Sequence, residues 1–178
     1  MTPVAPRECA IRAGTVDDVP AVLAMLDAAV EWLAANGRTG QWGTDPMSAD
    51  RRRREAAVQW ATSGGFHVAE SDGRPVGALV VGAAAAYVPP ATEPELYVVL
   101  LVTDRRHAGR GIGGRLLEHA RHLARRAGVS LLRVDCYRGP DRALVRYYES
   151  QGFVATDEFT VDLPRGLWPG QVLEQRLA

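Results

Sequence analysis

The N-terminal third of the chain has helical hydrophobic periodicity, following a short strand predicted over residues 9–13. Apolar residues recur three or four positions apart over residues 19–33, which predicts an amphipathic helix. The preceding residues 15–18 (TVDD) pair a hydroxyl with an acid three positions later, which is typical of a helix N-terminus. Residues 37–46 are predicted to form a loop, and a second helix is predicted from a cap at Ser48 to about residue 62.

The period then changes to that of strands. Residues 66–70 and 75–81 predict two strands, and Asp72-Gly73 between them is a hairpin signal. After a proline-broken loop over residues 87–95 comes LYVVLLVT, residues 96–103. This run has no polar alternation, so we expect a strand that is buried on both faces.

The C-terminal half alternates helices with strands. A helix to about residue 127 is followed by a strand at 131–136, a helix at 141–150 and a strand from Phe153. A last strand is predicted at 172–177. The whole order predicts an α/β fold, a mixed sheet with helices on its faces. The length of 178 residues predicts a single domain, residues 1–178.

A glycine-rich loop lies between the predicted strand 96–103 and the next helix. Its glycines are Gly109, Gly111, Gly113 and Gly114, and arginines surround them. Glycine lets backbone N–H groups approach a ligand closely, and the first N–H groups of a helix lack partners within it. This combination favours an anion site, most naturally for phosphate.

Two common phosphate motifs fit this loop poorly. Gly109-x-Gly111-x-x-Gly114, with Asp135 at the end of a later strand, satisfies the dinucleotide fingerprint literally. However, polar residues separate the glycines from their strand, and only 43 residues follow Asp135, too few for a second half of a doubly wound sheet. The chain contains no lysine, which excludes a P-loop.

The loop and a second segment resemble the GCN5-related N-acetyltransferases, abbreviated GNAT. The family pattern is a strand, then Arg/Gln-x-x-Gly-x-Gly/Ala, then a helix with a leucine pair. Gly111-Ile112-Gly113 and Leu116-Leu117 match it, with Ala108 at the Arg/Gln position. A second register, Arg106-x-x-Gly109-x-Gly111, fits two residues earlier. Residues 144–153 (LVRYYESQGF) resemble the family's Leu-Tyr-Glu-x-x-Gly-Phe segment.

The resemblance implies a fold and an activity. The fold is a mixed, mostly antiparallel sheet of about seven strands with a splayed parallel pair and about four helices. The activity is transfer of the acetyl group of acetyl-CoA to a primary amine of a small molecule, by direct attack in a ternary complex. Two alternatives remain open: a non-catalytic acyl-CoA-binding sensor or interaction module, and a protein N-acetyltransferase.

The resemblance also implies which residues bind the acyl donor. The backbone edge of Leu101, Val102 and Thr103 would hold the pantetheine arm. Asp141 stands where the family often has asparagine. The pyrophosphate would be held by the loop residues Gly109, Arg110, Gly111, Ile112, Gly113 and Gly114.

Catalytic and acceptor roles follow in the same way. Tyr148 takes the family's tyrosine position and is the candidate general acid for the leaving thiolate. Glu95, with its neighbour Glu93, is the candidate general base. The expected acceptor pocket lies between the first two helices and is lined by Trp32, Gln41 and Trp42.

Composition narrows the expected partners. The 21 basic and 21 acidic residues give a formal net charge of zero, which argues against nucleic-acid binding. No apolar run approaches the roughly 18 residues of a membrane span, and the four histidines and two cysteines lack metal-ligand spacing. Residues 1–6 contain no apolar leader, so a cytoplasmic location is expected. Many relatives dimerise, which makes the closing strands candidates for a homodimer contact.

Overall fold

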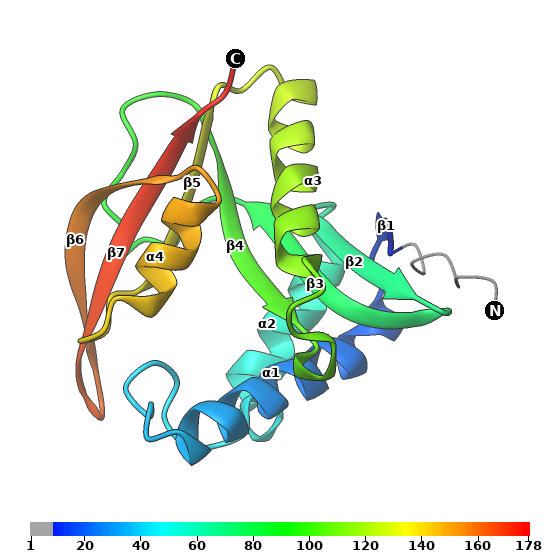
Figure 1. Cartoon of the computed structure of the whole chain (residues 1–178), viewed down its shortest axis with the longest axis vertical. Coiled ribbons are helices and arrows are strands. Elements are labelled where there is room, and N and C mark those ends of the chain that lie inside the picture. Colours follow the sequence, from blue (N-terminus) through cyan, green and yellow to red (C-terminus); the bar gives the residue numbers. More distant parts are fainter. Residues whose placement is uncertain (1–8) are drawn as a thin grey trace, which may run out of the picture.

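The computed structural model describes residues 9–178, so the expectation about residues 1–6 lies outside the described part. One seven-stranded sheet has the order β1-β2-β3-β4-β5-β7-β6 (Figure 1). Among these strands only β4 and β5 pair in parallel. The strands are β1 (Ala10–Ala13), β2 (Phe66–Ser71), β3 (Arg74–Gly82), β4 (Glu95–Thr103), β5 (Leu131–Tyr137), β6 (Val154–Leu163) and β7 (Gly166–Arg176). The expected mixed sheet with one parallel pair is confirmed.

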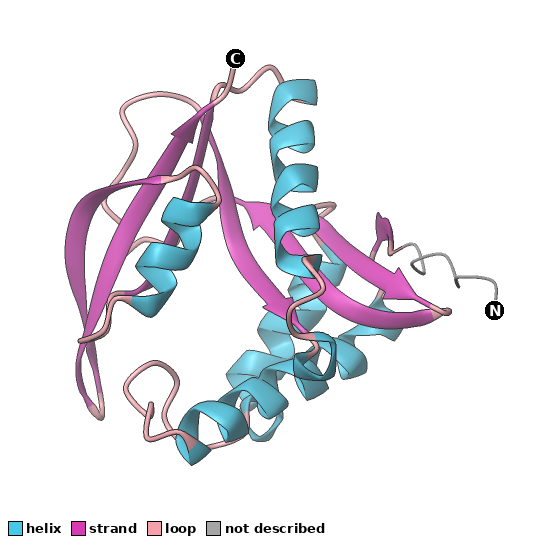
Figure 2. Cartoon of the chain, in the orientation of Figure 1, coloured by secondary structure: helices cyan, strands magenta, loops and turns pink. Residues whose placement is uncertain are grey.

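Four helices cover the two faces of the sheet (Figure 2). They are α1 (Val19–Ala35), α2 (Arg51–Thr62), α3 (Ile112–Arg126) and α4 (Ala143–Ser150). On one face, α1 packs on β3 and β4 while α2 packs on β2; on the other, α3 packs on β3, β4 and β5 and α4 on β5, β6 and β7. None of the helices within residues 9–178 is long and apolar enough to cross a membrane.

Each face of the sheet has its own buried cluster. Below α1, Val22 and Val30 pack with Val80. Below α3, Leu116 and Leu117 are fully buried in a separate cluster. Each leucine buried in this way stabilises the fold by about 1.5–3 kcal/mol, so the two layers of helices hold the sheet from both sides.

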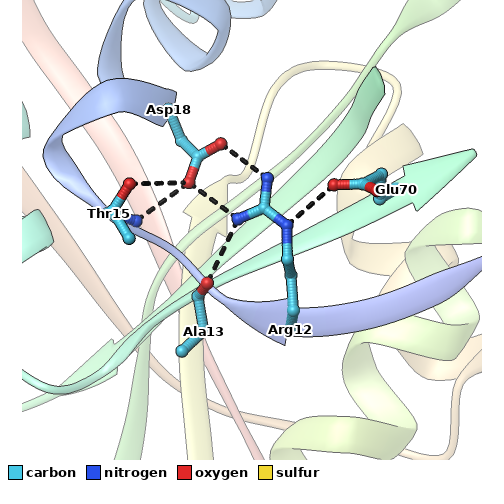
Figure 3. Close-up of polar contacts among 5 residues, drawn as sticks. All are labelled: Arg12, Ala13, Thr15, Asp18 and Glu70. Carbon is cyan, nitrogen blue, oxygen red and sulfur yellow. Dashed lines mark hydrogen bonds and ion pairs between the residues drawn. The ribbon is translucent and has the colours of Figure 1, made fainter. Parts of the chain in front are cut away.

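A network of charged side chains fixes the start of α1 (Figure 3). The Arg12 guanidinium donates two hydrogen bonds of 2.8 Å to Asp18 and one of 2.7 Å to Glu70 on β2. The Thr15 N–H donates to the same Asp18 carboxylate at 2.8 Å. The predicted helix start is therefore confirmed, with aspartate in the place that glutamate usually takes. Because Arg12 bonds to it, the pKa of Asp18 lies below its ordinary value.

Two predicted helix starts are wrong. Ser48 does not cap α2, because its N–H and hydroxyl donate to Asp27 on α1, at 2.9 and 2.5 Å. Asp50 is the cap instead and accepts from the N–H of Arg52. The last helix begins at Ala143, two residues later than expected, since Arg142 adopts a left-handed conformation with φ 52°.

The predicted bounds of the strands are mostly confirmed. Asp72 and Gly73 both have positive φ and form the expected hairpin turn. The last strand is longer than predicted, because Gly166–Arg176 pairs with both β5 and β6 despite Pro169 within it. β6 forms a free edge of the sheet, and the expected homodimer contact there stays a prediction.

Candidate active site

The glycine loop follows β4 and leads directly into α3. Gly109 and Gly111 adopt positive φ of 77° and 71°, which L side chains rarely adopt, and Gly111 is the N-cap of the helix. The first hydrogen bond of α3 runs from the Arg115 N–H to the Gly111 carbonyl at 3.1 Å. The N–H groups of residues 111–114 therefore have no acceptor among residues 9–178 and lie at the positive end of the helix dipole. The sequence prediction of an anion site fits this geometry.

The arginines around this loop differ in what they contact. Arg106 forms an ion pair with Asp104 at 2.7 Å. Arg105 lies over the ring of Trp32 on α1, 3.6 Å from its centre, and Arg115 donates to the carbonyl of Cys9. Arg110 is exposed and makes no side-chain hydrogen bond or ion pair within the described part of the chain. Arg110 is thus the loop cation that a phosphate can recruit without breaking an internal contact.

The sheet opens beside this loop. β4 and β5 pair only over Glu95–Val98 and Leu131–Val134, and beyond them the two strands diverge (Figure 1). The register of β4 against β3 shifts at the same point, and Val99 there is 42% exposed. The edge of β4 from residue 99 to 103 has no strand partner on its β5 side. An extended ligand arm can therefore hydrogen-bond to this edge, as a further strand would.

The predicted pantetheine residues lie on this free edge. Thr103 ends the strand, Val102 is buried in the cluster below α1, and Leu101 packs against the cluster below α3. The side chains of Leu101 and Val102 are occupied by the two cores, and the register against β3 turns the backbone of Val102 toward that strand. Leu101 and Thr103 therefore present their backbone groups to the free edge, as the family resemblance implies for this strand.

A cavity of about 150 Å³ lies below the opening. It lies between the end of α1, the loop that follows it, the end of β5 and the start of α4. Two predicted residues, Gln41 and Asp141, line it, and Arg38 forms an ion pair with Asp141 at 3.0 Å. The other two predicted acceptor residues do not line it: Trp32 stacks with Arg105, and Trp42 packs against the core below α1.

Two neighbouring tyrosines of α4 face the interior near the opening. Tyr148 is 7% exposed, packs edge-on against Phe153, and its hydroxyl has no hydrogen-bond partner within residues 9–178. Burial raises the pKa of Tyr148 above its ordinary value. The Tyr147 hydroxyl lies against Gly113, where an added Cβ would collide with it. Tyr147 thus reaches from α4 to the first turn of α3.

Glu95 is engaged in a structural ion pair. Its carboxylate accepts from the Arg133 guanidinium at 2.9 Å, and the Arg133 side chain is only 3% exposed. Arg133 also donates to the carbonyl of Pro89 at 2.7 Å. Glu95 begins β4, at the opposite end of the strand from the glycine loop, while Glu93 pairs with Arg176. This placement argues against the predicted role of Glu95 as the general base.

The structure brings together two polar residues that sequence reasoning did not assign to the site. The Tyr97 hydroxyl on β4 donates a short hydrogen bond to Asp135 on β5, where the two strands begin to diverge. The signal in the sequence was the alternation of Arg133, Asp135 and Tyr137 with apolar residues inside a buried strand. That alternation indicates a polar face in the middle of the sheet.

A mixed sheet that opens between two parallel strands, with a glycine loop at the start of the next helix, is the arrangement that the GNAT resemblance implies. The family model described as "Acetyltransferase (GNAT) family" matches residues 26–153. The chain therefore belongs to the GNAT acetyltransferase family, whose acyl donor is acetyl-CoA. No curated protein matches the sequence.

Solved structures share this fold across nearly the whole chain. A ribosomal-protein-alanine N-acetyltransferase from Brucella melitensis is 25% identical, with a TM-score of 0.68, covering 94% of this chain and 99% of the other. The putative acetyltransferase yncA from Salmonella typhimurium, solved with acetyl-CoA, is 19% identical, with a TM-score of 0.69 and coverages of 96% and 95%. An agmatine N-acetyltransferase mutant is 20% identical, with a TM-score of 0.67 and coverages of 95% and 99%.

Proposed function

We propose that this chain is an N-acetyltransferase that moves the acetyl group of acetyl-CoA to a primary amine of a small molecule, by direct attack while both substrates are bound. The observation that carries the proposal is the opening between β4 and β5 beside the N-terminus of α3. It offers unpaired N–H groups for a pyrophosphate and a free strand edge for an extended arm. Family membership and the neighbour solved with acetyl-CoA support the same donor.

Each part of the chain has a task in this reaction. The N–H groups of residues 111–114, with Arg110, bind the phosphates, and the free edge of β4 holds the pantetheine arm. The backbone N–H of Leu101, which faces this edge, stabilises negative charge on the thioester oxygen in the proposed reaction. Tyr148 supplies a proton to the leaving thiolate, because its hydroxyl donates no hydrogen bond to another group within residues 9–178.

A specific contact favours a small acceptor over a protein. The loop after α1 is fastened to the β6–β7 hairpin, because the Gln41 carbonyl accepts from the Trp168 indole at 2.8 Å and from Arg165 at 2.9 Å. Figure 1 shows this loop beside the tip of the hairpin. Because Gln41 also lines the cavity, this contact fixes one wall of it. The agmatine enzyme among the neighbours is named for a small amine.

The test combines binding with turnover. Calorimetry should show acetyl-CoA binding, and a thiol assay should show release of CoA that depends on an added amine. Gly111→Ala and Gly128→Ala are matched variants, since both glycines have positive φ, 71° and 69°, with no atom near the added Cβ. Both should cost similar stability, and only Gly111→Ala should weaken acetyl-CoA binding, by roughly tenfold or about 1.4 kcal/mol.

Three results would contradict the proposal in different ways. Lack of acetyl-CoA binding would refute the donor assignment. Equal acetyl-CoA affinity of the two glycine variants would mean that the phosphates do not bind at the glycine loop. Binding without turnover of any amine in a broad screen would favour the non-catalytic acyl-CoA-binding module instead.

A further inference from the structure

A polar and aromatic surface lies on the face of the C-terminal half of the sheet that none of the four helices covers, and the loop before β4 packs on part of it through Val88. On this face α1 and α2 pack on β2, β3 and β4, whereas α3 and α4 cover the opposite face. Asp135 and Tyr137 of β5 point to the uncovered face, because their partners on β7, Val172 and Gly170, lie in one layer with them. Val172 packs with Tyr97 and Phe159 in a small cluster of its own.

Aromatic rings form a continuous row beside Asp135. Tyr87 lies 5.9 Å from Phe159, Phe159 lies 6.2 Å from Trp168, and Trp168 lies 5.8 Å from Tyr137, measured between ring centres. The Phe159 ring lies over Gly170, where a Cβ would collide with it. The row therefore depends on a glycine in β7, and it joins the loop before β4 to the hairpin that holds Gln41.

Asp135 is the carboxylate of this surface that lies where β4 and β5 begin to diverge. The last residues that pair between β4 and β5 are Val98 and Val134, so Asp135 directly follows the last paired position. The Asp135 carboxylate accepts from the Tyr97 hydroxyl, and no arginine within residues 9–178 forms an ion pair with it. Glu95, by contrast, is neutralised by Arg133.

We propose that Asp135, held by Tyr97 and flanked by the row Tyr87–Phe159–Trp168–Tyr137, binds the ammonium group of an acceptor with an aromatic or apolar body and takes its proton. This inference rests on the proposed function. A carboxylate beside aromatic faces is the arrangement that attracts an organic cation, since ring faces carry negative electrostatic potential. The chemical class of the acceptor is thus a primary amine that is positively charged in water and carries an apolar group.

The proton balance of the step is complete. Asp135 accepts one proton from the ammonium, and the freed lone pair forms the C–N bond to the acetyl carbon as the C–S bond breaks. The sulfur takes a proton from the Tyr148 hydroxyl. The nitrogen then loses its second proton, which restores the Tyr148 hydroxyl. The proton on Asp135 passes to solvent, so amide, thiol and one released proton balance the ammonium and the thioester.

The groups around Asp135 favour this role. Burial raises the pKa of Asp135 above its ordinary value, and the hydrogen bond from Tyr97 partly offsets that rise. Its negative charge contributes to the raised pKa values of Tyr87 on the preceding loop and of Tyr148 on α4. Two nearby cations have the opposite effect: the charge of Arg133 lowers the pKa of Tyr97, and that of Arg53 on α2 lowers the pKa of Tyr87. The charge of Asp135 also raises the pKa of the neighbouring Cys136 thiol. A carboxylate with a raised pKa is a stronger base than an exposed one.

The test uses the full chain, acetyl-CoA and two amines, 2-phenylethylamine and ethylamine. Asp135→Asn should lower kcat at least a hundredfold with acetyl-CoA affinity unchanged, since the amide keeps the shape and still accepts from Tyr97. Tyr97→Phe should move the acid limb of the pH profile upward, because loss of that hydrogen bond raises the pKa of Asp135 further. Asp162→Asn, an exposed carboxylate of β6, is the control.

The aromatic row is tested by substrate preference. Wild type should use 2-phenylethylamine with a kcat/KM at least tenfold above that of ethylamine, and Phe159→Ala should remove this preference. Full activity of Asp135→Asn, an unmoved acid limb in Tyr97→Phe, or a wild type that acetylates other amines but neither of these two would each overturn the inference. Absence of acetyl-CoA binding would instead refute the proposed function, so the two failures are distinguishable.

Discussion

Tyr148 is deeply buried, and its hydroxyl forms no hydrogen bond with another described residue. Tyr148→Phe should lower turnover at saturating substrate at least tenfold, because the leaving thiolate loses its proton donor, and should leave acetyl-CoA affinity within about twofold. Tyr147→Phe is the comparison on the same helix: its hydroxyl lies at Gly113, so the change should alter acetyl-CoA affinity rather than saturated turnover. Steady-state kinetics with calorimetry separates the two effects.

The pH profile of the wild type gives an independent check on Tyr148. Burial raises the pKa of this tyrosine, so its hydroxyl stays protonated beyond the ordinary tyrosine value of about 10. Turnover should therefore show no loss from this group up to pH 10. An alkaline loss below that value, present in wild type and absent in Tyr148→Phe, would contradict a raised pKa.

Substitutions at Glu95 and Glu93 test whether Glu95 has a structural role or acts as the general base. Glu95→Gln should lower the free energy of unfolding by about 3 kcal/mol, because it leaves the buried Arg133 charge without its partner. Glu93→Gln, which breaks a more exposed pair with Arg176, should cost less than about 1 kcal/mol. Urea unfolding measures both. A folded Glu95→Gln protein whose acid limb disappears would restore the sequence-based assignment of Glu95 as the base.

At the scale of elements, the Arg12–Asp18 contact ties β1 to the start of α1 (Figure 3). Asp18→Asn should reduce stability by about 1–2 kcal/mol at pH 7, a value lowered for the partial exposure of Arg12. The folded pKa of Asp18 is depressed, so its contribution is present above the unfolded value of about 3.9 and is lost as pH falls through the folded pKa. The free energies of unfolding of wild type and variant should therefore converge as the pH falls below 4. A difference that stays constant with pH would show that the ionised Asp18 carboxylate is not the source of the stability.

Local sequence signals located most elements, because each depends on residues close in the chain. The periodicity of residues 19–33 and the Asp72-Gly73 turn identified α1 and the β2–β3 hairpin. The start of β7 was missed because Pro169 and Gly170 weaken any strand signal. Pairing on both sides nevertheless holds that segment extended. Ser48 was misassigned because its actual partner, Asp27, lies on another helix.

The site was predictable only in part. Gly111 and the free edge of β4 follow from contiguous motifs and from the family resemblance. The contact between Tyr97 and Asp135 joins residues 38 positions apart and depends on the register of a parallel pair, which no local pattern encodes. Glu95 was expected near the chemistry from the family resemblance and its place just before the buried strand, and its pairing with the buried Arg133 becomes visible only in the folded sheet.

For the whole molecule, the two halves of the sheet share only the short pairing of Glu95–Val98 with Leu131–Val134. A ligand that fills the opening and contacts both halves binds the folded state alone, so it must raise the free energy of unfolding. At a hundred times its Kd, acetyl-CoA should add about 2.7 kcal/mol and raise Tm by roughly 5–10 °C for a chain of this size. Differential scanning fluorimetry measures the shift, and Gly111→Ala should need a higher acetyl-CoA concentration to reach it. A shift equal in that variant and in wild type would mean that acetyl-CoA stabilises the chain without using the glycine loop.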